Sequence, residues 1–166
     1  MPALRKDTAN KVVIVVDTRE QLPYSFDEDK ADSVRRKLAA GDYSIEGFED
    51  RVAVERKTMD DFVNTVIHRR KRFYKELRLL AEYELACVVV EASLETVHNG
   101  LYVGEAHPNA VFGSAVSICV DFGVPVFFCS DRQLARKFTE MFLLRAHRRL
   151  TRDDEKFGAE HTKQPF

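Results

Sequence analysis

A chain of 166 residues, 45% of them hydrophobic, is long enough for one domain with a buried core and too short for two domains of ordinary size. Its 26 basic and 27 acidic residues nearly cancel, which excludes an overall basic excess and means that any DNA-binding surface must be local. No apolar run approaches the length of a membrane span or of a signal-peptide core, so we expect a soluble protein with no membrane partner.

The three cysteines bear on the compartment. Cys87, Cys119 and Cys129 are odd in number, far apart and each set in an apolar run. This pattern favours buried free thiols over a disulfide framework or a zinc site. We therefore expect a reducing, cytoplasmic setting, associated with the nucleoid if the source is prokaryotic.

The chain begins with a polar segment of mixed charge, residues 1–11, which predicts an N-terminal tail. Residues 12–150 are predicted to form the domain. Three unbroken β-branched or apolar runs within it have the length and composition of strands that are covered on both faces: residues 12–16, 86–90 and 124–128. Such strands imply a central sheet with parallel members.

Two different patterns follow the first run. Ala31, Val34 and Leu38 have helical spacing and predict a short helix that is stopped by Gly41. Residues 43–46 and 52–57 then alternate between apolar and polar side chains, with turn chemistry in between. This segment predicts an antiparallel hairpin set into a mostly parallel sheet.

Three longer helices are predicted downstream, and a polar segment without apolar periodicity, residues 151–166, predicts a C-terminal tail. Their markers are Phe73, Leu77 and Leu80 for the first helix, Pro108 and Gly123 for the ends of the second, and a capping box of Ser130 and Gln133 for the third. We therefore expect an α/β fold with a mixed central sheet, an antiparallel hairpin within it and helices on both faces.

The hairpin carries residues that suit phosphodiester hydrolysis. Because side chains alternate across a strand, Glu55 and Lys57 share one face and Arg56 points to the other. Asp42 begins the partner strand, where a second carboxylate can face Glu55. Carboxylates hold Mg²⁺ or Mn²⁺, the metal lowers the pKa of a bound water, and a lysine supplies a cation beside the nucleophile. The alternative for a bare Glu-x-Lys is an ordinary ion pair on a solvated sheet surface.

The setting of these residues is more specific than the tripeptide. Gly41-Asp42, a spacer, and then Glu55-Arg56-Lys57-x-x-x-Asp61 resembles the motif of the XPF-type structure-specific endonuclease family, and the likeness spans roughly residues 13–146. The resemblance implies a restriction-endonuclease-like fold. It also implies cleavage of branched or flapped DNA with Mg²⁺ or Mn²⁺ as the cofactor.

The resemblance also implies roles for individual residues. Asp42 and Glu55 are expected as metal ligands, Lys57 as the residue that positions or activates the water, and Arg56 and Asp61 as supports. Asp17-Thr-Arg-Glu20 resembles the acidic segment that opens the family's active site, so Asp17 and Glu20 join the catalytic candidates and Glu20 the metal ligands. Asp17 also closes the first strand, and sites in open α/β sheets gather at the carboxyl ends of strands.

Simpler interpretations stand beside these roles. Asp61 lies three residues after Thr58 and fits the acidic position of a helix capping box. Asp17 fits a turn. Arg19 is either a surface cation or a phosphate contact, and Arg56 would brace the site from the other face by pairing with a carboxylate.

A basic cluster follows the motif. On the predicted helix its members recur at three-residue spacing while Phe73 and Leu77 face the core, which favours a surface that tracks DNA phosphates over a merely solvated face. The predicted DNA-binding residues, besides Arg19, are Arg69, Arg70, Lys71, Arg72, Lys75 and Arg78.

The chain departs from the family in what surrounds the nuclease residues. It shows neither tandem helix-hairpin-helix motifs nor a helicase, and no phosphate-binding loop for a nucleotide cofactor. Two other functions therefore stay open: another nuclease of the same fold, such as a resolvase or a mismatch or restriction enzyme, and a non-catalytic DNA-binding scaffold. Since family members pair through their nuclease domains, the resemblance also implies a homodimer or heterodimer.

Overall fold

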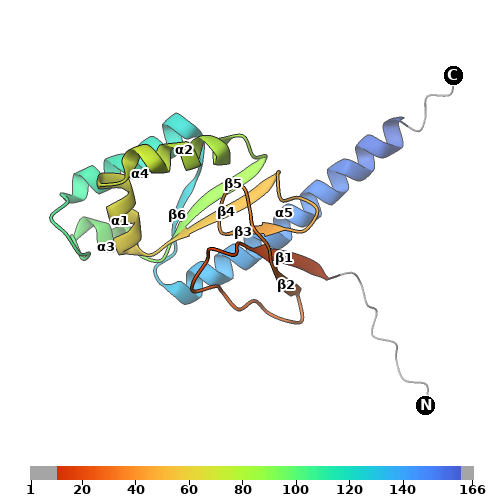
Figure 1. Cartoon of the computed structure of the whole chain (residues 1–166), viewed down its shortest axis with the longest axis horizontal. Helices are drawn as coiled ribbons and strands as arrows, with labels where there is room; N and C mark the ends of the chain where they lie inside the picture. Colours follow the sequence, from red (N-terminus) through yellow and green to blue (C-terminus); the bar gives the residue numbers. More distant parts are fainter. Residues whose placement is uncertain (1–10, 162–166) are drawn as a thin grey trace, which may run out of the picture.

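The computed structural model describes residues 11–161, in which one mixed sheet carries helices on both faces (Figure 1). The strands run in the order β2-β1-β3-β4-β5-β6. Their bounds are β1 Val12–Val16, β2 Ala31–Arg35, β3 Tyr43–Ile45, β4 Val52–Lys57, β5 Leu85–Val90 and β6 Val126–Phe128. The three apolar runs are therefore strands β1, β5 and β6, as predicted.

The pairing of the strands confirms the mixed sheet. Strand β3 is antiparallel to both β1 and β4, whereas β1 pairs with β2, β4 with β5 and β5 with β6 in parallel. In β5 the side chains from Cys87 to Val90 are all fully buried, because helices cover both faces of the parallel half. The hairpin of β3 and β4 thus joins the two halves of the sheet.

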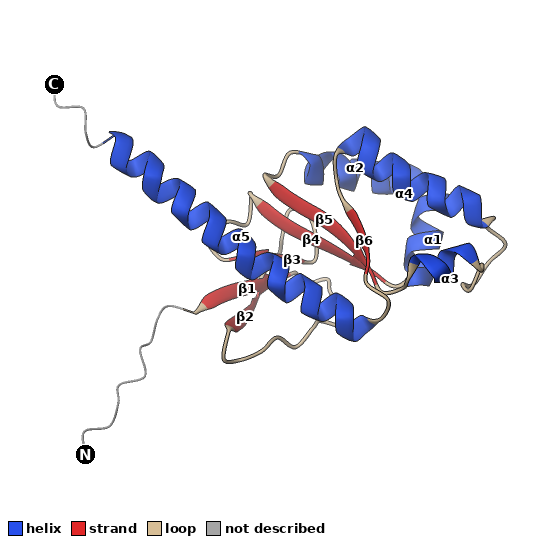
Figure 2. Ribbon diagram, turned by 180° about the vertical axis from the view of Figure 1, so that it is seen from behind, coloured by secondary structure: helices blue, strands red, loops and turns tan. Residues whose placement is uncertain are grey.

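The helices are divided unequally between the faces. Four of them cover one face: α1 Met59–Ile67, α2 Arg70–Ala81, α3 Leu94–His98 and α4 Pro108–Phe122. The long helix α5, Arg132–His161, crosses the other face and packs Ala135, Leu143 and Leu150 against the sheet (Figure 2). The prediction of helices on both faces is confirmed.

The prediction of a short helix at Ala31, Val34 and Leu38 is wrong. This segment contains strand β2, which pairs with β1 in parallel. The backbone of β1 offers unpaired hydrogen-bonding groups on that side, and pairing with them outweighs three apolar residues at helical spacing. Leu38 lies beyond the strand, where its backbone N–H donates to the Asp17 carboxylate at 2.6 Å.

Helix α5 differs from the prediction at both ends. Its N-terminal side-chain acceptor is Asp131, which accepts from the backbone N–H of Leu134 at 2.8 Å, whereas Ser130 has a φ of 66°. At the other end the helix continues through the predicted tail to His161, stabilised by the ion pair of Arg51 with Asp154 at 2.9 Å. The predicted segments 1–10 and 162–166 lie outside the described residues.

The cysteines are free, but they are not all buried. Cys87 is buried in β5 and Cys129 is partly buried, whereas Cys119 is exposed on α4 because it points away from the core stripe of that helix. The prediction of three buried thiols is therefore wrong for Cys119. Within residues 11–161, no helix combines the length and apolar character needed to cross a membrane.

Candidate active site

Strand β4 presents the central pair of the site. Glu55 and Lys57 lie on one face of the strand, where Lys57 Nζ donates to Glu55 Oε1 at 3.0 Å. Their side chains are only 12% and 13% exposed, and the lysine ammonium lies 5.1 Å from the ring centroid of Phe73 on α2. Helix α2 therefore closes over a buried ion pair instead of leaving it on a solvated surface.

Gly41 determines where Asp42 lies. The glycine has a φ of +75°, and a Cβ at this position would come within 3.0 Å of Ala53 Cβ on β4. Such a close approach needs glycine. It lets the Asp42 backbone N–H donate to Val54 O at 2.9 Å, and the Asp42 side chain then accepts from the backbone N–H of Arg56 at 2.8 Å. The hairpin thus holds Asp42 against β4 at both its backbone and its side chain.

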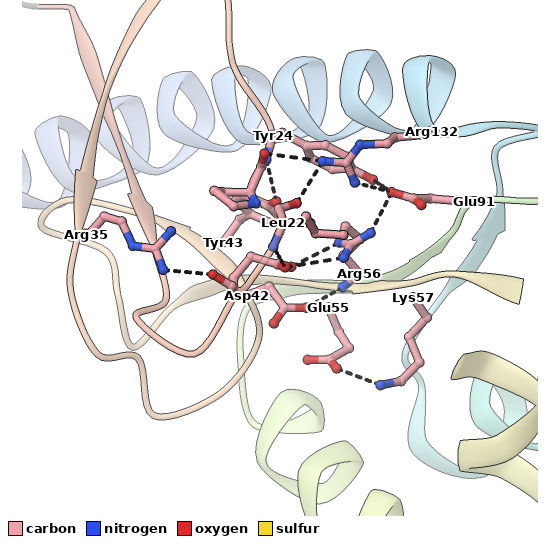
Figure 3. Close-up of polar contacts among 12 residues, drawn as sticks. Leu22, Tyr24, Arg35, Asp42, Tyr43, Glu55, Arg56, Lys57, Glu91 and Arg132 are labelled. Atoms are coloured by element: carbon pink, nitrogen blue, oxygen red, sulfur yellow. Dashed lines mark hydrogen bonds and ion pairs between the residues drawn. The ribbon is translucent and has the colours of Figure 1, made fainter. Parts of the chain in front are cut away.

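The carboxylates of Asp42 and Glu55 lie on the same side of β4, opposite the Arg56 guanidinium (Figure 3). Burial and then the charge of Glu55 raise the pKa of Asp42 to about 8, against the hydrogen bond from Arg56. Burial likewise raises the pKa of Glu55, although Lys57 opposes the shift. Burial alone would lower the pKa of Lys57, but Glu55 outweighs it and raises it. Two interacting carboxylates beside one cation make a site that favours added positive charge.

A pocket of about 180 Å³ opens beside this pair. Glu55 and Lys57 form part of its wall, and Arg69 and Arg72 from the predicted basic cluster form another part, together with Glu76 on α2. Arginine side chains in this position can bind a phosphate close to the carboxylates. The structure therefore brings part of the basic cluster to the catalytic candidates.

Asp17 and Arg19 form a separate unit beside the site. The Asp17 carboxylate is buried and accepts from the backbone N–H of Arg19, from its guanidinium and from the backbone N–H of Leu38. Both carboxylate oxygens are thus engaged, which makes Asp17 an anchor for the loop after β1. The Arg19 side chain is 63% exposed, and the charges of Asp17, Asp42 and Glu55 raise its pKa. The Arg19 guanidinium is held by Asp17 and by the backbone carbonyl of Leu38, to which it donates at 3.1 Å.

Glu20 lies close enough to Asp42 for its charge to raise the pKa of that carboxyl, but its own oxygens have other partners. They accept from the Arg56 guanidinium, at 3.0 Å for the Nε contact, and from the backbone N–H of Leu22. Glu20 therefore pairs with Arg56 in this structure, and its assignment as a metal ligand stays a prediction. Within residues 11–161, no group of three or more acidic, histidine or cysteine side chains is arranged to hold a metal ion.

Arg56 braces the site from the other face, as predicted, and the residues that hold it were missed by the sequence analysis. Glu91 Oε1 accepts from Arg56 Nη1 at 2.8 Å, from the Tyr24 hydroxyl at 2.8 Å and from Arg132 Nη1 at 3.1 Å (Figure 3). Arg132 also donates to the backbone carbonyl of Leu22 at 2.7 Å. The network fastens the loop after β1 and the start of α5 to strand β4. Glu91 comes directly after the buried parallel strand β5, just as Asp17 comes directly after β1. Its position at the carboxyl end of a strand could therefore have identified Glu91 as a site residue.

Asp61 and the rest of the basic cluster do not line the pocket. Asp61 is exposed in the first turn of α1, and its backbone N–H donates to Thr58 Oγ1 at 3.2 Å, which is one half of the predicted capping box. Arg70 donates to the hydroxyl of Tyr74 at 2.7 Å. The remaining cations are exposed along α2: Lys71, Lys75 and Arg78.

Comparison with known proteins identifies the family. The ERCC4 domain model matches residues 16–142, most of the chain. The chain belongs to the ERCC4 domain family. This result confirms the predicted XPF-type nuclease domain.

Two curated relatives from archaea match parts of the ERCC4 chain. It is 34% identical over 122 residues to "Putative ATP-dependent RNA helicase MJ1505" of Methanocaldococcus jannaschii, and 32% identical over 111 residues to "3'-flap repair endonuclease Xpf" of Saccharolobus solfataricus. The matches cover 74% and 64% of this chain but only 14% and 44% of these relatives. The chain therefore spans less than half the length of either protein.

Solved structures agree on the fold of the ERCC4 chain. XPF from Aeropyrum pernix superposes with a TM-score of 0.66 at 22% identity, over 86% of this chain and 69% of that one. The same protein in complex with DNA gives a TM-score of 0.62 at 19% identity, over 83% and 66%. The restriction-endonuclease-like α/β fold is confirmed.

The donor set of the ERCC4 site fits a hard divalent cation. Asp42 and Glu55 offer carboxylate oxygens, the ligands that Mg²⁺ and Mn²⁺ prefer, and Mg²⁺ usually keeps several waters when one or two carboxylates bind it. Burial and then the charge of Glu55 raise the pKa of Asp42, so its ionised form lacks a compensating positive charge. A bound cation would supply that charge.

Proposed function

We propose that this ERCC4 chain is a divalent-metal-dependent DNA endonuclease that hydrolyses phosphodiester bonds at branched or flapped DNA during repair or recombination. The observation that carries the proposal is the Asp42 and Glu55 carboxylate pair beside Lys57, at a pocket bordered by Arg69 and Arg72. The archaeal relative named as a 3'-flap repair endonuclease supports the choice of substrate.

Each part of the site has a role in this proposal. Mg²⁺ or Mn²⁺, when bound, neutralises charge on the phosphate and lowers the pKa of a coordinated water. Asp42 and Glu55 hold that ion. Lys57 orients the attacking water and stabilises the charge that develops in the transition state. Arg69 and Arg72 bind the phosphate backbone next to the cut.

The remaining candidates support these residues. Asp17 fixes the loop that carries Arg19, and Arg19 offers a second phosphate contact on the open side of the carboxylates. Glu20 holds Arg56, which in turn fixes the backbone N–H that binds Asp42. Asp61 acts at the start of α1. We retain Glu20 both as a positioning residue for Arg56 and as a candidate metal ligand.

The test is cleavage of a panel of branched, flapped, nicked and plain duplex DNA with Mg²⁺, with Mn²⁺ and with EDTA. We expect cleavage of the branched or flapped substrates, loss of cleavage in EDTA, and loss in Glu55→Gln. Glu95→Gln changes the same charge on exposed α3 and should cut at the parental rate. Cleavage of plain duplex in preference to branched DNA would identify another nuclease of this fold. DNA binding without cleavage under any metal would identify a scaffold.

We also propose that the chain pairs with a second nuclease domain, either a copy of itself or a related chain. An apolar surface at strand β6 and helix α5 supports this. Leu134 and Met141 on α5 are 48% and 59% exposed, and they border a groove of about 410 Å³ with Phe127 and Phe138. Exposed apolar surface of this kind commonly marks a protein interface.

A reducing, cytoplasmic setting stays part of the proposal. Three free cysteines support it, since the exposed thiol of Cys119 would be open to oxidation outside such a compartment. Localisation of a tagged chain in its native cells tests this assignment. Recovery of the tagged chain in a secreted or periplasmic fraction would contradict it.

A further inference from the structure

Helix α5 carries a second concentration of positive charge that the active site does not use. Five exposed cations fall within about 100° of the helix circumference, given about 100° per residue. They form the α5 basic face: Arg145, Arg148, Arg149, Arg152 and Lys156. The neighbouring acids, residues 153–155, point to the sides and back of the helix, apart from a contact of Arg149 with Asp153 at 3.7 Å. Charge is therefore sorted by face in a chain that is almost neutral overall.

The acids on the back of α5 are used for attachment. Arg51, in the turn before β4, pairs with Asp154 at 2.9 Å and also with Glu84 in the connection from α2 to β5. This arginine fixes the helix where it runs past the end of the sheet (Figure 1). The orientation of the α5 basic face is thus determined by ion pairs.

Helices α2 and α5 cover opposite faces of the sheet, and their cations come nearest to each other at Leu85, where β5 begins. Helix α2 begins next to the active-site pocket, with Arg69 and Arg72 in its wall, and ends at Ala81, four residues before Leu85. Leu85 lines a groove of about 500 Å³ together with Arg145 and Arg149. Cations therefore lie along α2 as far as Arg78 and again on α5 beside Leu85, and Glu84 between them is paired with Arg51.

We propose that the α5 basic face binds the phosphate backbone of a duplex arm of the DNA substrate, on one side of the cut. This inference rests on the proposed function for its substrate. From Arg51 to Lys57, strand β4 spans about 20 Å, or about six base pairs of duplex at 3.4 Å each. Asp154, which pairs with Arg51 at the start of β4, lies between Arg152 and Lys156 in the sequence, so most of the face runs alongside β4 and does not add to its length. Only an arm longer than about six base pairs reaches from Lys57 to the end of β4 where the face lies.

The experiment measures DNA binding in EDTA, so that it does not depend on cleavage. Arg148→Gln, Arg152→Gln and Lys156→Gln are combined in one chain, and binding to hairpin-capped duplexes of about 5 and about 20 base pairs is titrated over a range of salt. We expect at least about tenfold weaker binding of the longer duplex and a salt slope lower by about three, because each lost phosphate contact removes about one unit. Affinity for the shorter duplex should stay the same.

Two controls separate this effect from net charge and from unfolding. Lys11→Gln, Lys30→Gln and Lys37→Gln remove three exposed charges beside strand β2 and should leave binding of both duplexes unchanged. Replacing Arg148 and Arg152 by lysine should restore binding, and helix content by circular dichroism should be unchanged throughout. Equal loss on both duplexes, or no loss on the longer one, overturns the inference. If the parental chain binds in this length-dependent way but never cleaves, the proposed nuclease function fails and the α5 surface stands.

Discussion

Lys57 differs from the two carboxylates beside it in what it contributes. It holds a proton beside Glu55 and does not offer a ligand to a cation. We predict that Lys57→Ala binds Mg²⁺ as tightly as the parental chain or more tightly, since a neighbouring positive charge is gone. Cleavage should fall by about two orders of magnitude or more, because an electrostatic group preorganised for the transition state is lost.

Calorimetric metal titration beside single-turnover cleavage measures the two effects separately. Glu55→Gln should lose both Mg²⁺ binding and cleavage. Lys37→Ala, at an exposed lysine beyond strand β2, should change neither Mg²⁺ binding nor the cleavage rate. A Lys57→Ala chain that cuts at the parental rate would remove the lysine from the mechanism.

Asp42 makes the stability of the metal-free protein depend on pH. Its folded pKa is about 8, against 3.8 for the ordinary group. Between these values the folded chain keeps a proton that the unfolded chain has lost, so the free energy of unfolding falls as the pH rises and levels off above pH 8. The amide side chain of Asp42→Asn cannot ionise at any of these pH values. This variant should therefore be more stable than the parental chain at pH 8 by several kcal/mol, at most about 5, with the gain vanishing near pH 4.

Urea denaturation in EDTA at pH 4, 6 and 8 measures this difference. Asp29→Asn, at an exposed loop residue, should show no gain with rising pH. An Asp42→Asn advantage that is the same at all three pH values would mean that Asp42 is not held protonated by its surroundings.

The sequence predicts the residues of β4 better than their partners. Alternation along one strand is enough to place Glu55 and Lys57 together and Arg56 on the other face. Which carboxylates meet Arg56 depends on the path of the loop after β1 and on the end of β5, far away in the sequence. For that reason the sequence does not show that Glu20 and Glu91 are the partners of Arg56.

At the scale of elements, the hairpin depends on Gly41. Gly41→Ala places a side chain at a φ of +75° and brings its Cβ within 3.0 Å of Ala53 Cβ. We predict a loss of about 2–3 kcal/mol in unfolding free energy, with reduced cleavage because Asp42 shifts away from Glu55. Gly47→Ala is the matched control: its φ is +84°, but nothing lies within 4 Å of the added Cβ. It should cost only about 1 kcal/mol, and a Gly41→Ala chain that is no less stable than this control would refute the steric argument.

Elements with a strong local signal were predicted, and those determined by distant contacts were not. Strand β5 is buried on both faces, and α4 has a proline at its start and a left-handed glycine at its end, so their own residues define them. Strand β2 has mostly exposed side chains and depends on pairing with β1. The last turns of α5 lack apolar periodicity and depend on the ion pair with Arg51.

Over the whole molecule, the Arg56 network connects the two faces of the sheet. The Arg56 backbone N–H holds Asp42 on the side of the pocket, while its guanidinium reaches Glu91 and, through it, Arg132 at the start of α5. The helix that carries the α5 basic face is thus attached at both ends of the sheet, near the site through Arg132 and at the far end through Asp154. DNA bound along α5 would therefore lie in a fixed relation to the carboxylates.

The apolar surface of β6 and α5 predicts association of the whole molecule. Strand β6 is the last strand of the sheet, and Leu134 and Met141 project beside it with about half of their area exposed. A second copy would cover both, because the burial of apolar area favours association.

We predict a particle of twice 19.1 kDa by light scattering, and a monomer when Leu134 and Met141 are both changed to glutamate. Leu101→Glu, at a side chain that is 66% exposed near α3, should leave the mass unchanged. A parental chain that is monomeric at micromolar concentration would reject self-pairing and leave a related chain as the partner to seek by co-expression.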